Sequence, residues 1–575
     1  MSDVTTTPEA PETEVQTAKP LAWPLGLAGV VLVIAGSFLS WSYDGTILGD
    51  LSINLYPGSL QILTIIVALL ALVLLLAEKG PLTKLGGWLD ATLGLRALGI
   101  WLTLYMVLVL VAIATESDGL INVNPGGYIS LVGAALILVS SRMLPLRQLR
   151  DMSEARLPGW FEILSIAVLM AAALFVAAFA LGLQDAWSFV LCLVFIAAVV
   201  AGLFRTGSMT WVGHAAQRNK KVLTLSAFVV AFLFPFTQGG SDANMSIATQ
   251  VLVFSATAMG LNIVVGLAGL LDLGYIAFLG SGAYVAATLS NSAFATIGWK
   301  PPFLVVVLVG ACVAALAGLI IGSPTLRVSG DYLAIVTLGF GEIFRFSMFN
   351  LDGNNGPNLT NGPNGIPGIP DLELFGFNFG DEHNVAGIDL GRFSNYYFLL
   401  LILIGGVILV FSRLNNSRIG RGWVAIREDE KAAEAMGVNV FGLKLLAFAV
   451  GAFLAGLAGT VKAHQDGAVS PDQYIFLESA FLLAAIVLGG MGTIAGVLLG
   501  ATILKLLPEK LRFFSEYRLL LFGLLLVLMM RFRPEGLVAN RRRLLEFHEE
   551  DEALAEAVEA EHLEAEEQLV VEEAK

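Results

Sequence analysis

The stretch Arg413–Lys444 reads RLNNSRIGRGWVAIREDEKAAEAMGVNVFGLK and separates two apolar runs, near 395–411 and 441–465. Apolar runs of this kind are typical of helices that cross a bilayer, which need roughly 20 residues. Inside the stretch, Lys431–Gly437 joins helix-favouring residues to a closing glycine. A charged helix between membrane spans is typical of a binding site for a soluble partner. The sequence therefore predicts a membrane protein that is driven from outside itself.

The composition supports a membrane protein throughout. Of the 575 residues, 56% are hydrophobic and only 14% are charged, whereas soluble domains carry roughly 25% charged residues. Apolar stretches of spanning length recur along the chain, and the alternation typical of outer-membrane strands is absent. The expected fold class is all-α and polytopic. With only two cysteines, Cys192 and Cys312, neither a disulfide framework nor a cysteine-rich metal site is expected.

Most of the net charge of −14 comes from one end of the chain. Residues Glu546 to Lys575 include thirteen acids and one base. This predicts a solvated acidic tail, and it gives no indication of a nucleic-acid partner. At the other end, residues 1–20 are polar and acidic and lack the pattern of a signal peptide.

Sixteen candidate spans follow from the apolar runs. The positive-inside rule places the basic loops, such as those with Arg142–Arg156 and Arg205–Lys221, in the cytoplasm. This arrangement predicts that both termini and the Arg413–Lys444 loop are cytoplasmic. The predicted spans lie near 23–43, 59–77, 97–115, 127–144, 160–182, 186–204, 222–236, 246–268, 272–290, 302–322, 331–350, 395–411, 441–465, 474–489, 492–507 and 515–532.

The basic linker 205–221 marks a change in character. Six plain apolar spans precede it, and glycine-rich, motif-bearing spans follow it. We therefore predict a domain boundary after residue 221, with an accessory bundle before it and a working core after it. The predicted segments are a polar tail at 1–20, a six-span accessory region at 21–221, a core at 222–540 with its charged loop at 413–444, and an acidic cytoplasmic tail at 541–575.

Two segments of the predicted core place polar residues within apolar spans. Asn262 and Asp272 lie in the glycine-rich segment Gly260–Gly274, where they should face the bundle interior or a cavity. Ordinary small-residue packing, with Asp272 at a water interface, is an equally open interpretation. Glu342 and Arg345 lie three residues apart on one helix face. They form either a functional pair or an ion pair that locks two helices.

The segment 351–394 is the longest predicted external loop. Its runs of Asn, Gly and Pro, including Asn361-Gly362-Pro363-Asn364-Gly365, specify tight turns. A long structured loop in a compact core usually has a function, and here we expect it to dock a partner outside the membrane. A solvated cluster of turns is the alternative.

No enzymatic constellation is present in the sequence. The five histidines are scattered without ligand spacing, and no Gly-Lys phosphate-binding loop occurs. Any energy from ATP must therefore enter through a partner. A second glycine-rich hairpin at Gly489–Gly496, paired with the break at Gly266–Gly274, indicates an internal repeat around a midplane pathway.

Taken together, residues 222–540 resemble the LivM-type permease of branched-chain amino acid ABC importers. The resemblance rests on five motifs in this order: Gly260-Leu261-Asn262 with its glycine-rich break; Gly330-Asp331-Tyr332 continuing through Thr337-Leu338-Gly339-Phe340-Gly341-Glu342; Thr360–Gly365; Ala425-Ile426-Arg427-Glu428-Asp429-Glu430 with Ala432–Gly437; and Phe532-Arg533-Pro534-Glu535-Gly536-Leu537.

The resemblance implies a type II importer core of about ten helices, preceded here by a six-helix extension. It also implies a homologous LivH-type permease, two cytoplasmic ABC ATPases, an extracytoplasmic solute-binding protein and surrounding membrane lipid as partners. This chain itself would carry no cofactor. The charged loop would hold the coupling helix that rests on an ATPase, with Arg427, Glu428, Glu430, Lys431, Ala432, Ala433, Glu434 and Gly437.

The remaining candidate sites come from the polar residues within the spans and from the external loop described above. The substrate path would include Asn262, Asp272, Thr337, Glu342 and Arg345, and the binding protein would dock at Asn361, Gly362, Pro363, Asn364 and Gly365. Two features depart from the family. Lys431 stands where the importer loop pattern begins with Glu, so the acid that contacts the ATPase is unassigned. The six-span extension is longer than the family would suggest.

We therefore expect a non-enzymatic permease subunit for Leu, Ile and Val in the cytoplasmic (inner) membrane of a prokaryote. A permease for urea, short amides or other amino acids is an alternative within the same class. A secondary transporter or channel without ATPases would fit the broken helices but would not need the charged helix. A membrane-embedded enzyme would need a polar or metal constellation that the sequence lacks.

Overall fold

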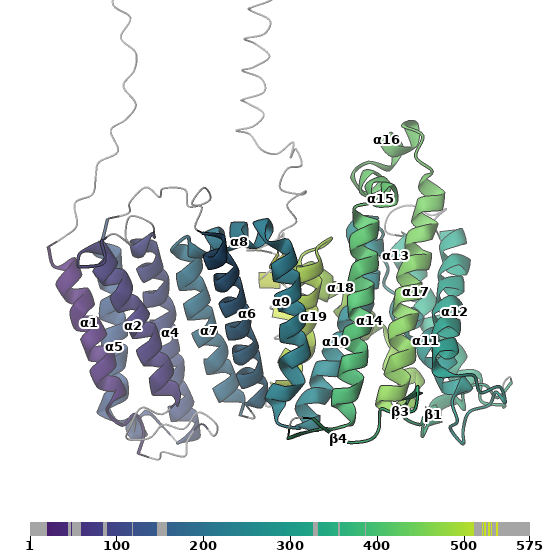
Figure 1. Ribbon diagram of the computed structural model, residues 1–575, viewed down its shortest axis with the longest axis horizontal. Helices are drawn as coiled ribbons and strands as arrows, with labels where there is room; N and C mark the ends of the chain where they lie inside the picture. The colour runs from purple at the N-terminus through teal and green to yellow at the C-terminus, as the bar shows by residue number, and fades with distance from the viewer. Residues whose placement is uncertain are drawn as a thin grey trace, which may run out of the picture. The chain divides into compact units, whose positions relative to one another are not determined.

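The computed structural model consists mainly of long apolar helices, as expected from the sequence (Figure 1). It describes residues 20–43, 59–83, 89–117, 119–145, 158–183, 185–325, 332–354, 357–385 and 387–510, together with Leu48 and scattered positions between 520 and 538. Within this part of the chain, twelve helices are long and apolar enough to cross a membrane, and two shorter apolar helices accompany them. The chain is thus an all-α, multi-pass membrane protein.

Two compact units make up the chain. The N-terminal unit holds the described residues up to Ser246 together with those of Glu382–Ser394, and the core unit holds the described residues of Ile247–Asp381 and Asn395–Leu507. The division lies inside a continuous helix, 25 residues beyond the boundary predicted at 221. The physical reason is that Lys220–Leu233 packs against Gly159–Gly182 of the N-terminal unit.

The N-terminal unit is a helical bundle, in which the helix Ala22–Ser37 packs extensively against the helix Pro125–Met143. A buried carboxylate fixes one of its turns: Glu162 accepts from Arg218 at 2.6 Å and from Asn219 at 2.9 Å. Its elements are α1 (Ala22–Ser37), α2 (Ser59–Glu78), α4 (Ala91–Glu116), η2 (Leu120–Asn122), α5 (Pro125–Met143), α6 (Gly159–Gly182), α7 (Ala186–Arg205), α8 (Ser208–Arg218), α9 (Lys220–Leu233), η4 (Phe234–Gln238), β4 (His383–Val385) and β5 (Ile388–Leu390).

The core unit contains the motifs that the sequence singled out. Its elements are α10 (Asp242–Asn262), which starts before the division, the π-helix η5 (Ile263–Leu267), α11 (Ile276–Leu289), α12 (Phe303–Thr325), α13 (Tyr332–Asn350), η6 (Gly362–Asn364), β1 (Ile366–Pro367), β2 (Glu373–Leu374), β3 (Phe377–Asn378), α14 (Arg392–Asn415), α15 (Arg418–Glu428), α16 (Glu430–Ala435), α17 (Val440–Asp466), β6 (Ala468–Val469), η7 (Pro471–Tyr474), α18 (Phe476–Gly489) and α19 (Ile494–Lys510).

Helix α17 is the central element of the core and packs against both α11 and α12. Glycine allows the close approach to α11, because a Cβ at Gly282 would overlap the carbonyl oxygen of Gly456, and one at Gly459 would overlap that of Leu279. Membrane helices gain no hydrophobic driving force from one another, so close contact between small residues is a main source of their association.

The two ends of the core unit carry different structures (Figure 1). Helices α15 and α16 project beyond one end of α14 and α17, and the short strands β1 and β3 lie at the opposite end. Strand β1 pairs with β6, which directly follows α17, through Ile366–Val469 and Pro367–Ala468. The 27 residues of α17 rise by about 40 Å, so this one helix connects the two ends.

Where the structure describes them, the predicted spans correspond to helices, but two are shorter than expected. The span expected at 23–43 is α1, which ends at Ser37. The span expected at 272–290 is the shorter helix α11, whose 14 residues start only at Ile276. At about 21 Å it is shorter than the ~30 Å hydrocarbon core. The charged loop also contains two helices rather than one. The predicted span 515–532, the termini at 1–19 and 541–575, and the motif residues Ser329–Asp331 lie wholly or mainly outside the described residues.

Candidate functional site: the projecting helix pair and an inner cavity

Local caps define the projecting pair of helices. Ser417 begins α15, because its hydroxyl accepts from the Gly420 N–H at 3.1 Å. Asp429 begins α16 in the same way and accepts from the Ala432 N–H at 2.9 Å. Gly437 follows α16 with a φ of 82°, the left-handed conformation that favours glycine after a helix. The sequence thus specifies a tight α15–turn–α16 unit.

Three side chains hold this unit against the core. The buried Trp423 donates its indole N–H to the Leu443 carbonyl at the start of α17, at 2.7 Å. Arg427 donates to the Gly266 carbonyl in η5, at 3.0 Å. Lys444 pairs with Glu430 at 2.6 Å. The projecting pair is therefore connected to α17 and to the end of α10.

The acidic residues of the pair have different environments. Glu428 pairs with the neighbouring arginine at 2.6 Å, Glu430 pairs with Lys444, and Asp429 is the cap of α16. Glu434 is exposed and forms no ion pair with any residue that the structure describes. Among these four acids, Glu434 is the one available to an external partner.

The outer face of α16 combines charge with apolar surface. Lys431, Ala432 and Glu434 are exposed, whereas Ala433 is buried against the rest of the unit. Met436, directly after the helix, is 84% exposed. A flexible apolar side chain beside charged ones is typical of a protein-binding surface.

Asn262, a predicted path residue, lies at a helix junction. It is fully buried; its side-chain oxygen accepts from the Gly492 N–H at 2.8 Å, and its amide nitrogen donates to the Thr493 carbonyl at 3.4 Å. It thereby connects α10 to the hairpin between α18 and α19.

Asp272 and Thr337 meet at the break before α11. Asp272 is buried and accepts from the Gly274 N–H at 2.9 Å, and its second oxygen has no hydrogen-bond partner among the described residues. Thr337 of α13 accepts from the Leu273 N–H at 3.1 Å. These contacts fix the chain where the helical path is interrupted.

Glu342 and Arg345 form the ion pair that their spacing predicts, with 3.1 Å between nitrogen and oxygen. Arg345 also reaches Asp472 of η7 at 3.5 Å. The arginine therefore connects α13 to the segment before α18.

The predicted docking residues form the turn at η6. Asn361 has a φ of 59° and donates its side-chain amide to the Gly365 carbonyl at 2.9 Å. Gly362 and Gly365 are buried, whereas Pro363 and Asn364 are exposed at the tip. Since β1 follows directly, this tip is connected to α17 through the β1–β6 pair.

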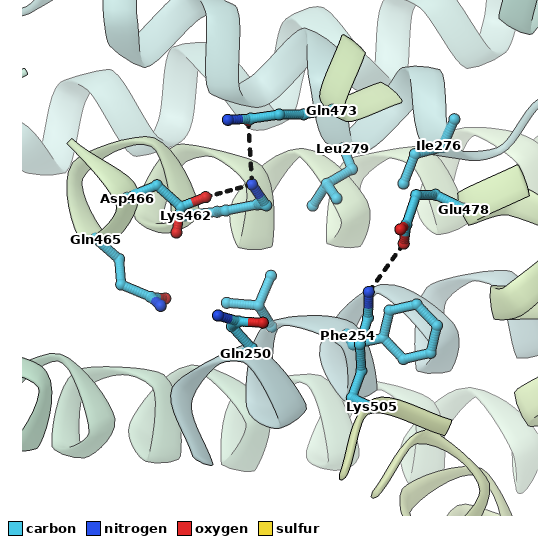
Figure 2. A pocket seen from close by; sticks show the side chains of 11 residues that line it. Gln250, Phe254, Ile276, Leu279, Lys462, Gln465, Asp466, Gln473, Glu478 and Lys505 are labelled. Carbon is cyan, nitrogen blue, oxygen red and sulfur yellow. Dashed lines mark hydrogen bonds and ion pairs between the residues drawn. The ribbon is translucent and has the colours of Figure 1, made fainter. Parts of the chain in front are cut away.

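A cavity of about 260 Å³ lies among α10, α11, α17, α18 and α19, all within the core unit (Figure 2). One wall is apolar and consists of Val253 and Phe254 from α10 with Ile276 and Leu279 from α11. Ile276 is the first residue of the short helix α11, and its N–H donates to the Ser479 hydroxyl at 3.0 Å. None of the five residues predicted for the substrate path lines this cavity.

A second wall of the cavity is polar. Lys462 pairs with Asp466 at 2.5 Å and also donates to Gln473 at 3.3 Å. Gln465 lies beside them on α17 and is 1% exposed. Figure 2 shows these side chains grouped at one side of the cavity. The spacing of Lys462, Gln465 and Asp466 places them on one helix face, which is the sequence signal that could have identified them.

A second ion pair lies beside the apolar wall. Lys505 of α19 pairs with Glu478 of α18 at 2.9 Å and lies 4.6 Å above the Phe254 ring. Both residues are single charges within apolar runs, and only the fold brings them together. Within the described part of the chain, no group of three or more His, Cys, Asp or Glu side chains could hold a metal ion.

Comparisons with known proteins agree with this architecture. Residues 243–530 match the family "branched-chain amino acid transport system / permease component". The high-affinity branched-chain amino acid transport system permease protein LivM of Salmonella typhimurium is 40% identical over 338 residues, which cover 56% of this chain and 76% of the relative. The probable LivM of Methanocaldococcus jannaschii is 25% identical over 322 residues, covering 52% and 86%. The fructose import permease protein FrcC of Rhizobium meliloti is 30% identical over 236 residues, covering 40% and 61%. No solved structure matches the chain.

Proposed function

Because the chain belongs to the family of branched-chain amino acid transport system permease components, we propose that it is a permease subunit of an ABC importer for Leu, Ile and Val. It is a transporter subunit rather than an enzyme, as are the relatives named above. ATP is bound and hydrolysed by separate partner subunits. The substrate pathway forms together with a sister permease of the LivH type.

The projecting α15–α16 unit is the observation that carries this proposal. A secondary transporter or channel has no need of a rigid, capped helix pair outside its helical core. Here the pair exposes Glu434 and Met436 and is tied to α17 and η5 by Trp423, Lys444 and Arg427. In our proposal α16 rests on a cytoplasmic ATPase, and Glu434 makes the acidic contact.

The same contacts suggest how ATP-driven motion reaches the pathway. Arg427 holds the η5 end of α10, and α10 also contributes Val253 and Phe254 to the cavity wall. A displacement of the α15–α16 unit therefore acts on a helix that lines the cavity. Asn262, on the same helix, extends this connection to the α18–α19 hairpin.

The proposed orientation follows from the position of α16. The α15–α16 end of the core faces the cytoplasm of a prokaryotic cell, as do both termini of the chain. The η6 turn then faces outward, where Pro363 and Asn364 would meet an extracytoplasmic binding protein. Branched-chain amino acids are the preferred solutes, because the match to the branched-chain permease is higher in identity and coverage than the match to the fructose permease.

Co-purification tests this function directly. The tagged full-length chain is purified from its native membrane, the accompanying proteins are identified, and ATPase activity and ATP-dependent leucine uptake are measured. We expect two ATPases, a second permease and leucine uptake. Glu434→Lys should reduce the recovered ATPase by roughly tenfold or more, since it reverses a contact charge.

Glu373→Lys is the matched control, because Glu373 is an exposed acid in β2. This strand pairs with β3, which lies at the end of the core opposite α16. It should leave ATPase recovery unchanged. Leucine uptake that persists after the ATPases are removed would overturn the proposal.

A further inference from the structure

The charges of the inner cavity balance within its own wall. Two lysines, Lys462 and Lys505, face two acids, Asp466 and Glu478, and each lysine is paired. A ligand with a net charge would leave one charge uncompensated in a partly buried site, which is costly. A ligand that carries one positive and one negative group can exchange partners with an existing pair, and the site stays neutral.

A buried acceptor at the same wall has no donor among the residues that the structure describes. Gln465 donates its amide to Thr249 at 2.9 Å, but within that part of the chain its side-chain oxygen has no hydrogen-bond partner, although the residue is only 1% exposed. An unsatisfied buried acceptor is unusual in a native protein. It lies one helical turn from Lys462 and next to Asp466, where an ammonium group could satisfy it.

The apolar wall lies next to this polar group. Val253, Phe254, Ile276 and Leu279 are all buried and have no hydrogen-bonding side chain, although Gln250 of α10 also lines the cavity. The cavity of about 260 Å³ lies just below the range of roughly 300–1,000 Å³ typical of drug-sized ligands. A single small amphiphile fits this size better than a peptide.

We infer that this cavity is a binding site for one zwitterionic α-amino acid with an aliphatic side chain. The ligand carboxylate takes Lys462, its ammonium takes Asp466 and the free oxygen of Gln465, and its side chain lies against the α10–α11 wall. The Lys505–Glu478 pair stays closed beside Phe254. This inference rests on the proposed function and adds a site within this one chain.

Equilibrium binding tests the site. The full-length chain in lipid nanodiscs is titrated with radiolabelled L-leucine, and unlabelled compounds compete. 4-Methylpentanoate lacks the ammonium, isoamylamine lacks the carboxylate, and glycine lacks the side chain. Each should compete at least tenfold less well than L-leucine, because each leaves one group of the site unpaired or one wall uncovered. Fructose should not compete.

Variants locate the site. Lys462→Gln and Gln465→Leu should each weaken leucine binding by roughly tenfold or more. The double variant Lys462→Asp with Asp466→Lys keeps an i,i+4 ion pair, so it preserves the fold while reversing the charges; it should also lose binding. Lys300→Gln makes the same change at an exposed lysine outside this cavity and should bind like wild type. Thermal unfolding of every variant checks that the fold is intact.

ATP-dependent uptake in native membrane vesicles separates the two hypotheses. Leucine uptake by wild type that is lost in Lys462→Gln and in the reversed pair supports the site. Wild-type uptake that these variants leave unchanged, with unchanged binding, overturns the site and leaves the proposed function standing. No leucine uptake by wild type overturns both.

Discussion

Helices α6 and α10 have similar hydropathy but differ in how much of each helix is buried. Both are apolar and long enough to cross a membrane, yet 78% of the spanning window of α10 with η5 is buried, compared with 11% for α6. The core helix carries polar residues that contact neighbours, such as Asn262. The accessory helix exposes Val168 and Phe175. Hydropathy therefore identifies both helices as candidate spans, and only packing distinguishes the buried helix from the exposed one.

The largest expected effect comes from a pair of glycines, one in each unit. Gly282→Ala in α11 places a methyl group on the carbonyl of Gly456, and overpacking of this kind costs about 1–3 kcal/mol. Gly182→Ala in α6 meets no atom within 4 Å and should be neutral or stabilise by about 0.5 kcal/mol. Thermal unfolding of the full-length chain measures both. Equal shifts would show that close packing does not distinguish the two units.

The next effect concerns the buried carboxylate of the N-terminal unit. Glu162→Gln removes the charge that faces Arg218 and should cost about 1–3 kcal/mol, moderated because Arg218 is partly exposed. The thermal midpoint should fall, while leucine uptake at low temperature stays at the wild-type level. Arg218→Lys keeps the charge and should lower the midpoint less. If Glu162→Gln reduces leucine uptake as much as Glu434→Lys does, the N-terminal unit has a direct role in transport.

The smallest effect compares two tryptophans. Trp423→Phe removes the hydrogen bond to Leu443 and should weaken the attachment of α15 to α17 by about 1 kcal/mol. This corresponds to a loss of roughly fivefold in ATPase recovery. Trp160→Phe changes a residue in α6 that is 67% exposed, and its effect should be undetectable. If equal amounts of ATPase co-purify with both variants, the indole hydrogen bond does not position the α15–α16 unit.

Local patterns account for what the sequence predicted well. Apolar run length indicates spans, and the caps at Asp429 and Gly437 define α16 without help from distant residues. The position of the charged loop between two helices followed for the same reason. The family resemblance followed from motifs that are contiguous in the chain.

The cavity could not be predicted in the same way, because its wall comes from two segments that are far apart in the sequence, Gln250–Leu279 and Lys462–Lys505. Lys505 and Glu478 are 27 positions apart, and each is a single charge in an apolar run. Helix α11 was predicted too long because residues 272–275 are as compatible with a span as those that follow. The break is fixed by a local bond from the Gly274 N–H to Asp272 and by a tertiary contact with Thr337. Of the cavity residues, only Lys462, Gln465 and Asp466 have a sequence spacing that predicts a shared helix face.

Helix α17 has a consequence for energetics. One of its ends holds Lys444, which pairs with Glu430 of the α15–α16 unit, and its other end continues into β6 and so to the η6 turn. Suppose that binding of a protein at one end favours the conformation to which the protein at the other end binds. Thermodynamic linkage then makes the effect reciprocal. A binding protein that docks outside would then tighten or loosen the ATPases by the factor by which they change its own affinity. Measuring the factor by which one affinity changes would give the factor for the other without a second experiment.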